Sequence, residues 1–465
     1  MNLIAFREMT HNLRLWVAAG PLLALTSAML TVVFSMRSAT ETAAEEEVGL
    51  MDQYDGTLLA LVLLSGLATA AVAIRQTALR TRRRTAYFSI AGLNPSVAST
   101  GFIQQLMGIA AIFTVLGALL GWAISPFAVE LIAWATSGRH DLVGHTDIHA
   151  ITGAAIITMG LALIASTRGS QVARDVEPIE ALKPRPYMPH QYGRRSFIVG
   201  FIAAGGAILT AVLAITLPSL ERYAYRPIEA ANVVAISAGA MAVLLAAFFA
   251  LAAPLYCPFL IRAWTVFIPE RHLPTLFLGR RGAAYQAGRT LEAFNVVLVG
   301  ALLVGSALSI YFARSSLDPA GRGWVEARDV SGVILAAVPL VLGLTGAILT
   351  VLAASRSRTD EARVLCLSGA TTRQVLAAGF FEAFILAVTA TAVALAGVAL
   401  VGTCTALGLA NVPGSPGWPQ TLGFDGPVWW APLGVTVLGM VLVTAASLPS
   451  LIRGLRSPAA WGTLV

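Results

Sequence analysis

The sequence has little charge for its length. Of its 465 residues only 12% are Asp, Glu, Lys or Arg, whereas 57% are hydrophobic, and the mean hydropathy is +0.76. A soluble domain keeps about a quarter of its residues charged, so this chain cannot cover a water-facing surface. The shortage of charge excludes a soluble globular protein and predicts an all-α, polytopic membrane protein.

Several functional motifs are also missing. The three cysteines, Cys257, Cys366 and Cys404, are far apart in the sequence and predict neither a disulfide framework nor a metal site. No GxxxxGK[ST] phosphate loop occurs, and no nucleophile–base pair or carboxylate pair stands out within an apolar run. We therefore expect neither an enzyme nor a nucleotide site, no cofactor in this chain, and no nucleic-acid partner.

Ten apolar runs are long enough to cross a bilayer, since about 20 helical residues span its hydrocarbon. If the chain starts inside, 24 of its 31 Lys and Arg residues lie on the inner side. This bias predicts cytoplasmic N- and C-termini, and we expect no cleavable signal. Pro126 predicts a kink or an exit from the membrane before Trp134. The predicted spans are 15–36, 57–77, 106–135, 150–167, 196–217, 232–256, 290–312, 332–354, 377–406 and 430–452.

A charged segment between the eighth and ninth spans predicts a rigid bend, which we call the second elbow (residues 356–375). Asp360 and Glu361 favour a helix start because carboxylates suit a helix N-terminus. Gly369 is expected to end this short helix, and Thr371 with Gln374 forms a capping box for the next one. Its predicted apolar side consists of Val364, Leu365 and Leu367.

A similar segment before the third span predicts a first elbow (residues 82–97). There Gly92 is the expected corner, and Asn94 with Pro95 starts the next helix. Its basic and apolar residues are Arg84, Tyr87, Phe88 and Ile90. We call the spacing from Gly92 to Gly369 the repeat offset. The same offset pairs Gln105 with Glu382, each near the start of a span.

The repeated pattern predicts two related modules of four spans. Each module ends in a basic turn that leads to a proline, Pro178 in the first and Pro458 in the second. The expected division is residues 1–185, residues 186–279 with the fifth and sixth spans, and residues 280–465.

The second elbow resembles the signature of FtsX-like (MacB-type) ABC transporter permeases, through Leu-Ser-Gly-Ala-Thr at 367–371 and Glu382 in the following span. The segment Pro178-Ile-Glu-Ala-Leu-Lys183 is similar to the Pro-x-x-Ala-Leu-Arg ending of that family. The first elbow departs from the pattern, with Arg84 in place of an acidic residue and Gln105 in place of glutamate. The short outer loops leave no room for an extracellular domain.

The resemblance implies a permease subunit of the bacterial cytoplasmic membrane, surrounded by lipid. A separate cytoplasmic ABC ATPase, in two copies that bind ATP and Mg²⁺, would dock on the elbows and drive export of an apolar or amphipathic compound. A non-transporting subunit that senses envelope compounds stays open as an alternative. An ion-coupled secondary transporter is a further alternative, although the spans hold few of the ionisable residues that it needs.

Four local features allow two interpretations each. An elbow can dock on an ATPase groove or rest on lipid headgroups, and Glu382 can face a cavity or pair with a nearby arginine. Gly117 and Gly121 can mark close helix packing or reflect the abundance of glycine. The loop with His140, Asp141, His145, Asp147 and His149 can bind zinc or copper or be an ordinary solvated loop, and we expect no metal there.

Overall fold

The computed structural model describes most of the apolar part of the chain and the second elbow. The described residues are 19–41, 58–78 (without 60, 64, 68, 72, 75 and 76), 95–137, 147–174, 194–220, 227–266, 274–285, 287–315, 336–349, 362, 364–412, 415 and 426–456. Within these ranges the secondary structure is helical and no strand occurs, which confirms the predicted all-α fold. The main helices are α3 (Ala19–Glu41), α5 (Pro95–Ser137), α6 (Ile148–Arg174), α8 (Arg194–Thr216), α9 (Pro227–Thr265), α10 (Pro274–Tyr285), α11 (Ala287–Ser315), α13 (Thr372–Ala410) and α14 (Gly426–Arg456).

Within the described ranges seven helices are long and apolar enough to cross a membrane. Three shorter apolar helices, Leu61–Ala71, Ala336–Leu349 and Val428–Leu442, lie where the second, eighth and tenth spans are predicted. Helix α5 continues through Pro126 to Ser137, while its candidate membrane span ends at Ile132, so the kink or membrane exit expected before Trp134 stays a prediction. A polytopic membrane protein is therefore supported, with a longer third span than expected.

In the first half, α3 packs against both α5 and α6, and α5 also packs against α6. A Cβ atom on Gly117 would lie 2.0 Å from the backbone oxygen of Ala24, and one on Gly121 would lie 2.5 Å from that of Ala28. These two glycines thus permit the backbones of α3 and α5 to approach closely. The structure favours the close-packing interpretation of this GxxxG pair.

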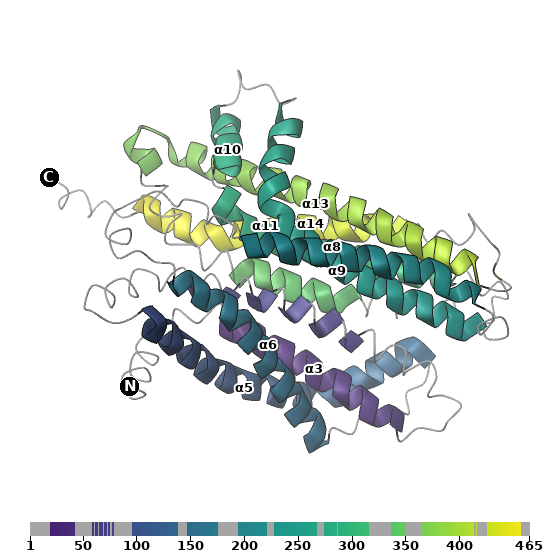
Figure 1. Cartoon of the computed structure of the whole chain (residues 1–465). Helices are drawn as coiled ribbons and strands as arrows, with labels where there is room; N and C mark the ends of the chain where they lie inside the picture. The colour runs from purple at the N-terminus through teal and green to yellow at the C-terminus, as the bar shows by residue number, and fades with distance from the viewer. Residues whose placement is uncertain are drawn as a thin grey trace.

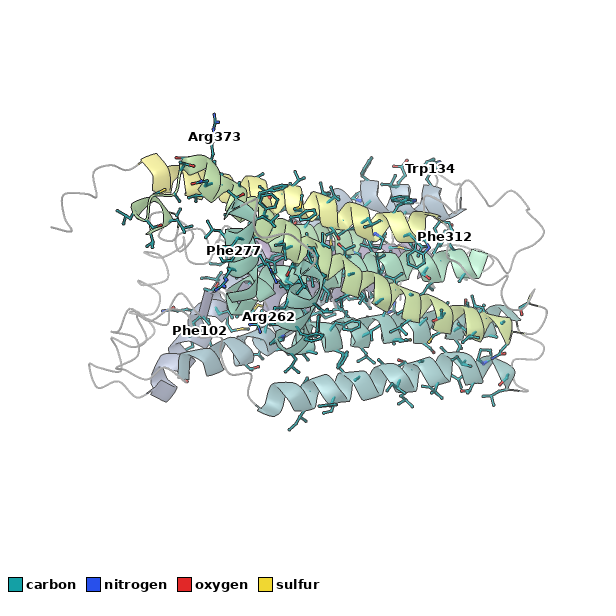
Figure 2. All side chains as sticks on the ribbon, turned by 90° about the horizontal axis from the view of Figure 1, so that it is seen from above. Phe102, Trp134, Arg262, Phe277, Phe312 and Arg373 are labelled. Atoms are coloured by element: carbon teal, nitrogen blue, oxygen red, sulfur yellow. The ribbon has the colours of Figure 1, made fainter. Side chains whose placement is uncertain are left out.

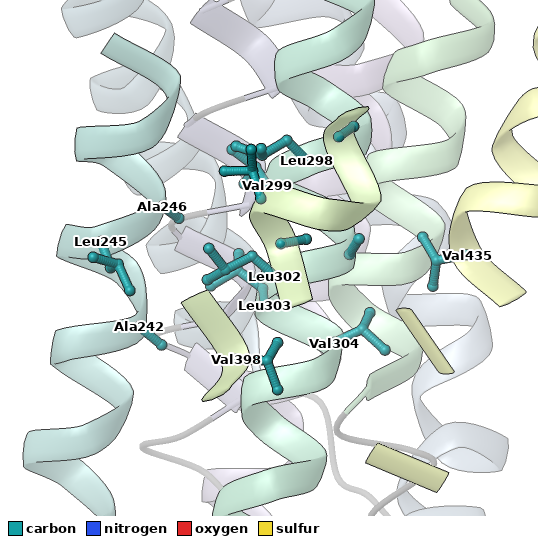
Figure 3. Close-up of a cluster of buried hydrophobic side chains, with 14 of the residues drawn as sticks. Ala242, Leu245, Ala246, Leu298, Val299, Leu302, Leu303, Val304, Val398 and Val435 are labelled. Carbon is teal, nitrogen blue, oxygen red and sulfur yellow. The ribbon is translucent and has the colours of Figure 1, made fainter. Parts of the chain in front are cut away.

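The second half repeats this packing with later helices, because α11 packs against α13 and α14, and α13 packs against α14. Helices α8 and α9 pack against each other and add a layer on α13, and α9 also packs against α11 (Figure 1). The core of this half is shown in Figure 3 and joins Leu245 of α9, Leu302 of α11, Val398 of α13 and Val435 of α14. The fifth and sixth spans therefore pack against the second half.

The two halves meet along the helices at 58–78 and 336–349. A Cβ atom on Gly346 would lie 3.0 Å from the Cγ2 of Thr69 and 3.1 Å from a methyl carbon of Val296. Val338 packs against the hydrophobic cluster that contains Leu61 in the first half. The halves are thus joined by close contact between apolar helices.

Candidate functional site

The candidate site is the second elbow, of which the structure describes residue 362 and residues 364–375. A short helix includes residues 364–367 and ends at Gly369, whose φ is +93°. The backbone N–H of Ala370 donates to the carbonyl of Leu365, and that of Gly369 donates to the carbonyl of Cys366, both at 3.0 Å. These two bonds form a Schellman motif, whose left-handed position is usually occupied by glycine. The predicted glycine corner is confirmed.

Helix α13 starts at once after this corner. The Thr371 side chain accepts a hydrogen bond from the backbone N–H of Gln374, and the Gln374 side chain accepts one from the backbone N–H of Thr371. This reciprocal pair is the predicted capping box, and it fixes the direction in which α13 leaves the elbow. Only Gly369 and Ala370 lie between Ser368, at the end of the short helix, and Thr371, the N-cap of α13. The bend therefore has little freedom to flex.

The apolar residues of the elbow point in two directions, which corrects the predicted single apolar side. Val364 is 64% exposed and Leu367 is 61% exposed. Leu365, in contrast, packs against Ala362 and Val375 within the chain. The three residues do not share a face because positions i and i+3 of a helix are neighbours on its surface, whereas i+1 is turned away. The exposed apolar pair is therefore Val364 and Leu367.

Most other predicted site residues cannot be placed. The first elbow residues Arg84, Tyr87, Phe88, Ile90 and Gly92 lie outside the described residues, as do Glu361, Pro178 and Pro458. Gln105 and Glu382 are described, and each is half-buried about three turns into its helix, α5 or α13. The role expected for them, as polar residues near the start of a span, stays a prediction.

Glu382 lies against α10, a helix that sequence reasoning did not connect with the elbow. A Cβ on Gly282 would be 3.4 Å from the Oε2 of Glu382, and one on Gly279 would be 2.8 Å from the Cβ of Phe381. The segment Gly279-Arg-Arg-Gly282 thus places two glycines on the side of α10 that touches α13. The signal available in the sequence was this pair of glycines three residues apart inside a basic segment.

The predicted acidic and histidine loop is only partly described. Asp147 and His149 start α6, whereas His140, Asp141 and His145 lie outside the described residues. Across the described ranges no group of three or more His, Cys, Asp or Glu side chains is arranged to hold a metal ion. Both interpretations of this loop, a zinc or copper site and an ordinary solvated loop, therefore stay open.

Comparison with known proteins gives one family match. Residues 333–459 match the model of the FtsX-like permease C-terminal domain, a segment that contains the helix at 336–349, the second elbow, α13 and α14. A search of curated proteins found no match. Proteins with this domain are membrane subunits of ABC systems and generally pair with a cytoplasmic ABC ATPase. Residues 333–459 of this chain are thus similar to the C-terminal domain of FtsX-like permeases.

Proposed function

We propose that this chain is the permease subunit of an ABC transporter, which exports an apolar or amphipathic compound from the membrane. The observation that carries the proposal is the second elbow. It exposes Val364 and Leu367 on the short helix that precedes α13, inside the segment that matches the permease family. Two exposed apolar residues one helical turn apart suit a groove on a partner protein.

The elbow is built to pass on a force. Its Schellman motif and capping box leave few rotatable residues between the short helix and α13. Helix α13 then runs for 39 residues through the core of the second half. A separate cytoplasmic ATPase that binds ATP and Mg²⁺ would thus displace the elbow, and the displacement would reach the packed helices beyond it.

We further propose that the chain consists of two FtsX-like modules, so that two ATPase subunits each dock on one elbow. The first residues of α5 and α13, Pro95 and Thr372, are separated by the repeat offset, the spacing between the two elbow glycines. Figure 2 places Phe102 and Arg373, near the starts of these helices, towards one end of the bundle, and Trp134 and Phe312 towards the other. This common direction supports elbows on one side of the membrane.

Close contacts between helices follow the same offset. Gly121 meets Ala28 in the first half, and the repeat offset takes these residues to Val398 and Gly305. The two counterparts also meet, since a Cβ on Gly305 would lie 2.5 Å from Val398. The glycine of this contact lies on α5 in the first half and on α11 in the second half. The helices nevertheless cross at corresponding positions in both halves. Such correspondence supports two modules with one internal packing.

The contact between the halves supports a twofold relation of the modules. Thr69 and Gly346 touch each other and are also separated by the repeat offset. In a twofold interface a residue meets its own counterpart only on the axis. We therefore place the axis of the two modules at this crossing.

A disulfide tests this placement. A Cβ on Gly346 would lie 3.3 Å from the Cβ of Thr69, close to the separation of about 3.8 Å that disulfides adopt. In a chain whose three cysteines are replaced by serine, Thr69→Cys with Gly346→Cys should cross-link under mild oxidation. Cleavage at a protease site inserted between residues 186 and 193 should then leave the halves joined on a non-reducing gel. Separate halves would refute the axis, and Thr69→Cys with Gly434→Cys is the control that should not cross-link.

The transport function is tested with the permease and its ATPase in proteoliposomes. A fluorescent phospholipid, an amphipathic peptide and an amphipathic dye serve as probes. We expect at least one to move across or out of the bilayer only while ATP is hydrolysed, and to stop with a non-hydrolysable ATP analogue. Stimulated ATP hydrolysis without movement of any probe would instead support an envelope-sensing subunit. Movement driven by an ion gradient without ATP would overturn both.

A further inference from the structure

Helix α9 is longer than the hydrocarbon core of a bilayer is thick. Its 39 residues correspond to about 58 Å at 1.5 Å per residue, whereas the hydrocarbon core is about 30 Å thick. Pro254 and Pro258 lie inside the helix. In Figure 1 the C-terminal part of α9 stands beside α10, across the direction of the other helices. The helix therefore bends in the region of its two prolines, as proline usually requires.

Pro254 has no backbone N–H and cannot bond the carbonyl of Ala250, four residues earlier. The side chain of Asn295 on α11 supplies this bond, because its Nδ2 donates to the Ala250 oxygen at 3.1 Å. The hydroxyl of Tyr256 donates to the neighbouring carbonyl of Phe249 at 3.0 Å. Two side chains thus cover the carbonyls at the bend, and one of them comes from another helix.

The side chain of Asn295 carries an energetic cost of burial. Its Oδ1 atom is buried and has no hydrogen-bond partner within the described part of the chain. A buried acceptor without a partner is unfavourable, so a leucine would suit this position on α11 if packing alone mattered. The donor function towards Ala250 explains why an amide stands there.

Beyond the bend, α9 is attached to α10 and α13. The indole Nε1 of Trp264 donates to the hydroxyl of Thr389 on α13 at 3.0 Å. The Nε of Arg280 on α10 donates to the hydroxyl of Thr265 at 3.0 Å. We call residues 259–266 and α10 (274–285) the arm. Its two parts are bonded to each other through Arg280 and Thr265, and the arm is bonded to α13 through Trp264.

Glycines bring the arm close to α13. Gly279 lies against Ala378 and Phe381, and a Cβ there would be 3.0 Å from the Ala378 carbonyl oxygen. In Figure 2 the end of α9 is marked by Arg262, α10 by Phe277, and the start of α13 by Arg373. A displacement at the start of α13 would thus displace the arm as well.

We propose that Pro254 and Asn295 form a hinge in α9, at which the arm turns when the second elbow moves. Asn295 anchors the membrane-spanning part of α9 to α11, because it bonds the carbonyl that the proline leaves open. The arm beyond the hinge follows α13 through Trp264 and through the glycines of α10. The bond between Asn295 and Ala250 is observed and carries the hinge, whereas the drive of the hinge by the elbow rests on the proposed ABC function.

A double-mutant cycle tests the hinge in the purified, full-length permease without any ATPase. Asn295→Leu leaves the Ala250 carbonyl unpaired when residue 254 is proline. Pro254→Ala restores a backbone N–H to that carbonyl, so Asn295→Leu should then cost less. We expect Asn295→Leu to lower the Tm by roughly 2–4 °C more in the parent chain than in the Pro254→Ala chain. Tyr256 is unchanged in all variants.

Pro258→Ala provides the matched control, because the carbonyl that Pro258 leaves open belongs to residue 254 and not to Ala250. The effect of Asn295→Leu in this background should equal its effect in the parent chain. Equal effects of Asn295→Leu in all three backgrounds would overturn the hinge. The hinge would also be overturned if Asn295→Leu raised the Tm of the parent chain and of the Pro254→Ala chain by the same amount.

The drive by the elbow is tested on the same variants with the ATPase bound. We expect Pro254→Ala to keep co-purification of the ATPase but to reduce transport of the responsive probe several-fold, since the restored backbone hydrogen bond to Ala250 stiffens α9 at residue 254. Full transport with Pro254→Ala would overturn the coupling of arm and elbow. If the parent chain did not bind the ATPase, that result would count against the proposed function. The Tm cycle would still test the hinge in that case.

Discussion

Replacement of Val364 and Leu367 by aspartate is expected to release the partner ATPase from the permease. Both side chains are exposed and apolar, and a charge in each would have to be buried without a partner in the ATPase groove. Central apolar anchors of an interface contribute about 2 kcal/mol or more each, so the double variant should bind at least roughly 100-fold more weakly. The measurement is co-purification of the ATPase, followed by titration of binding in detergent or nanodiscs.

The control keeps the charge change but leaves the apolar pair intact. Ser368 and Thr372 are exposed polar residues of the same elbow, and Ser368→Asp with Thr372→Asp should retain the ATPase. Leu365→Asp is a poor probe of docking, because Leu365 packs against Ala362 and Val375 and its loss would disturb the elbow itself. Normal binding by the Val364→Asp/Leu367→Asp variant would refute docking at the second elbow and favour an elbow that rests on lipid headgroups.

Gly117→Val is expected to prevent the first half from packing. A Cβ at this position would lie 2.0 Å from the backbone oxygen of Ala24, and two further backbone atoms of that residue would be 2.6 and 2.7 Å away. Backbone cannot move aside as a flexible side chain can, so α3 and α5 would have to separate. Overpacking of a core costs about 1–3 kcal/mol even where side chains can adjust, and we expect a larger loss here. The readout is the yield of monodisperse protein in size-exclusion chromatography.

Gly160→Val serves as the matched control. Gly160 is also a glycine inside a membrane helix, α6, but no heavy atom lies within 4 Å of a Cβ built on it. This variant should give a near-normal yield, which separates the steric effect from the general effect of valine in a helix. If Gly117→Val accumulated as well as Gly160→Val, the close approach of α3 and α5 would be contradicted.

Local sequence signals were sufficient for the second elbow. Gly369 ends a short helix because only glycine takes positive φ without strain, and the Thr371–Gln374 box needs only residues three apart. Both depend on neighbours in the chain, and the structure has them as predicted. The direction of each apolar side chain was harder to predict. Leu365 turned inward because it meets Val375 on the next helix, a contact that depends on the angle of the corner.

The sequence by itself determined that the chain is helical and membrane-embedded, because composition and run length depend on the solvent and not on the neighbours of each residue. The repeat offset also pointed to two related halves before any contact was visible. Tertiary structure alone decided how α10 lies on α13, where Asn295 meets the carbonyl left open by Pro254, and which glycines face a backbone. These contacts join residues far apart in the chain, and in a sequence rich in small apolar residues many alternative pairings satisfy the same pattern. Packing geometry selects one of them.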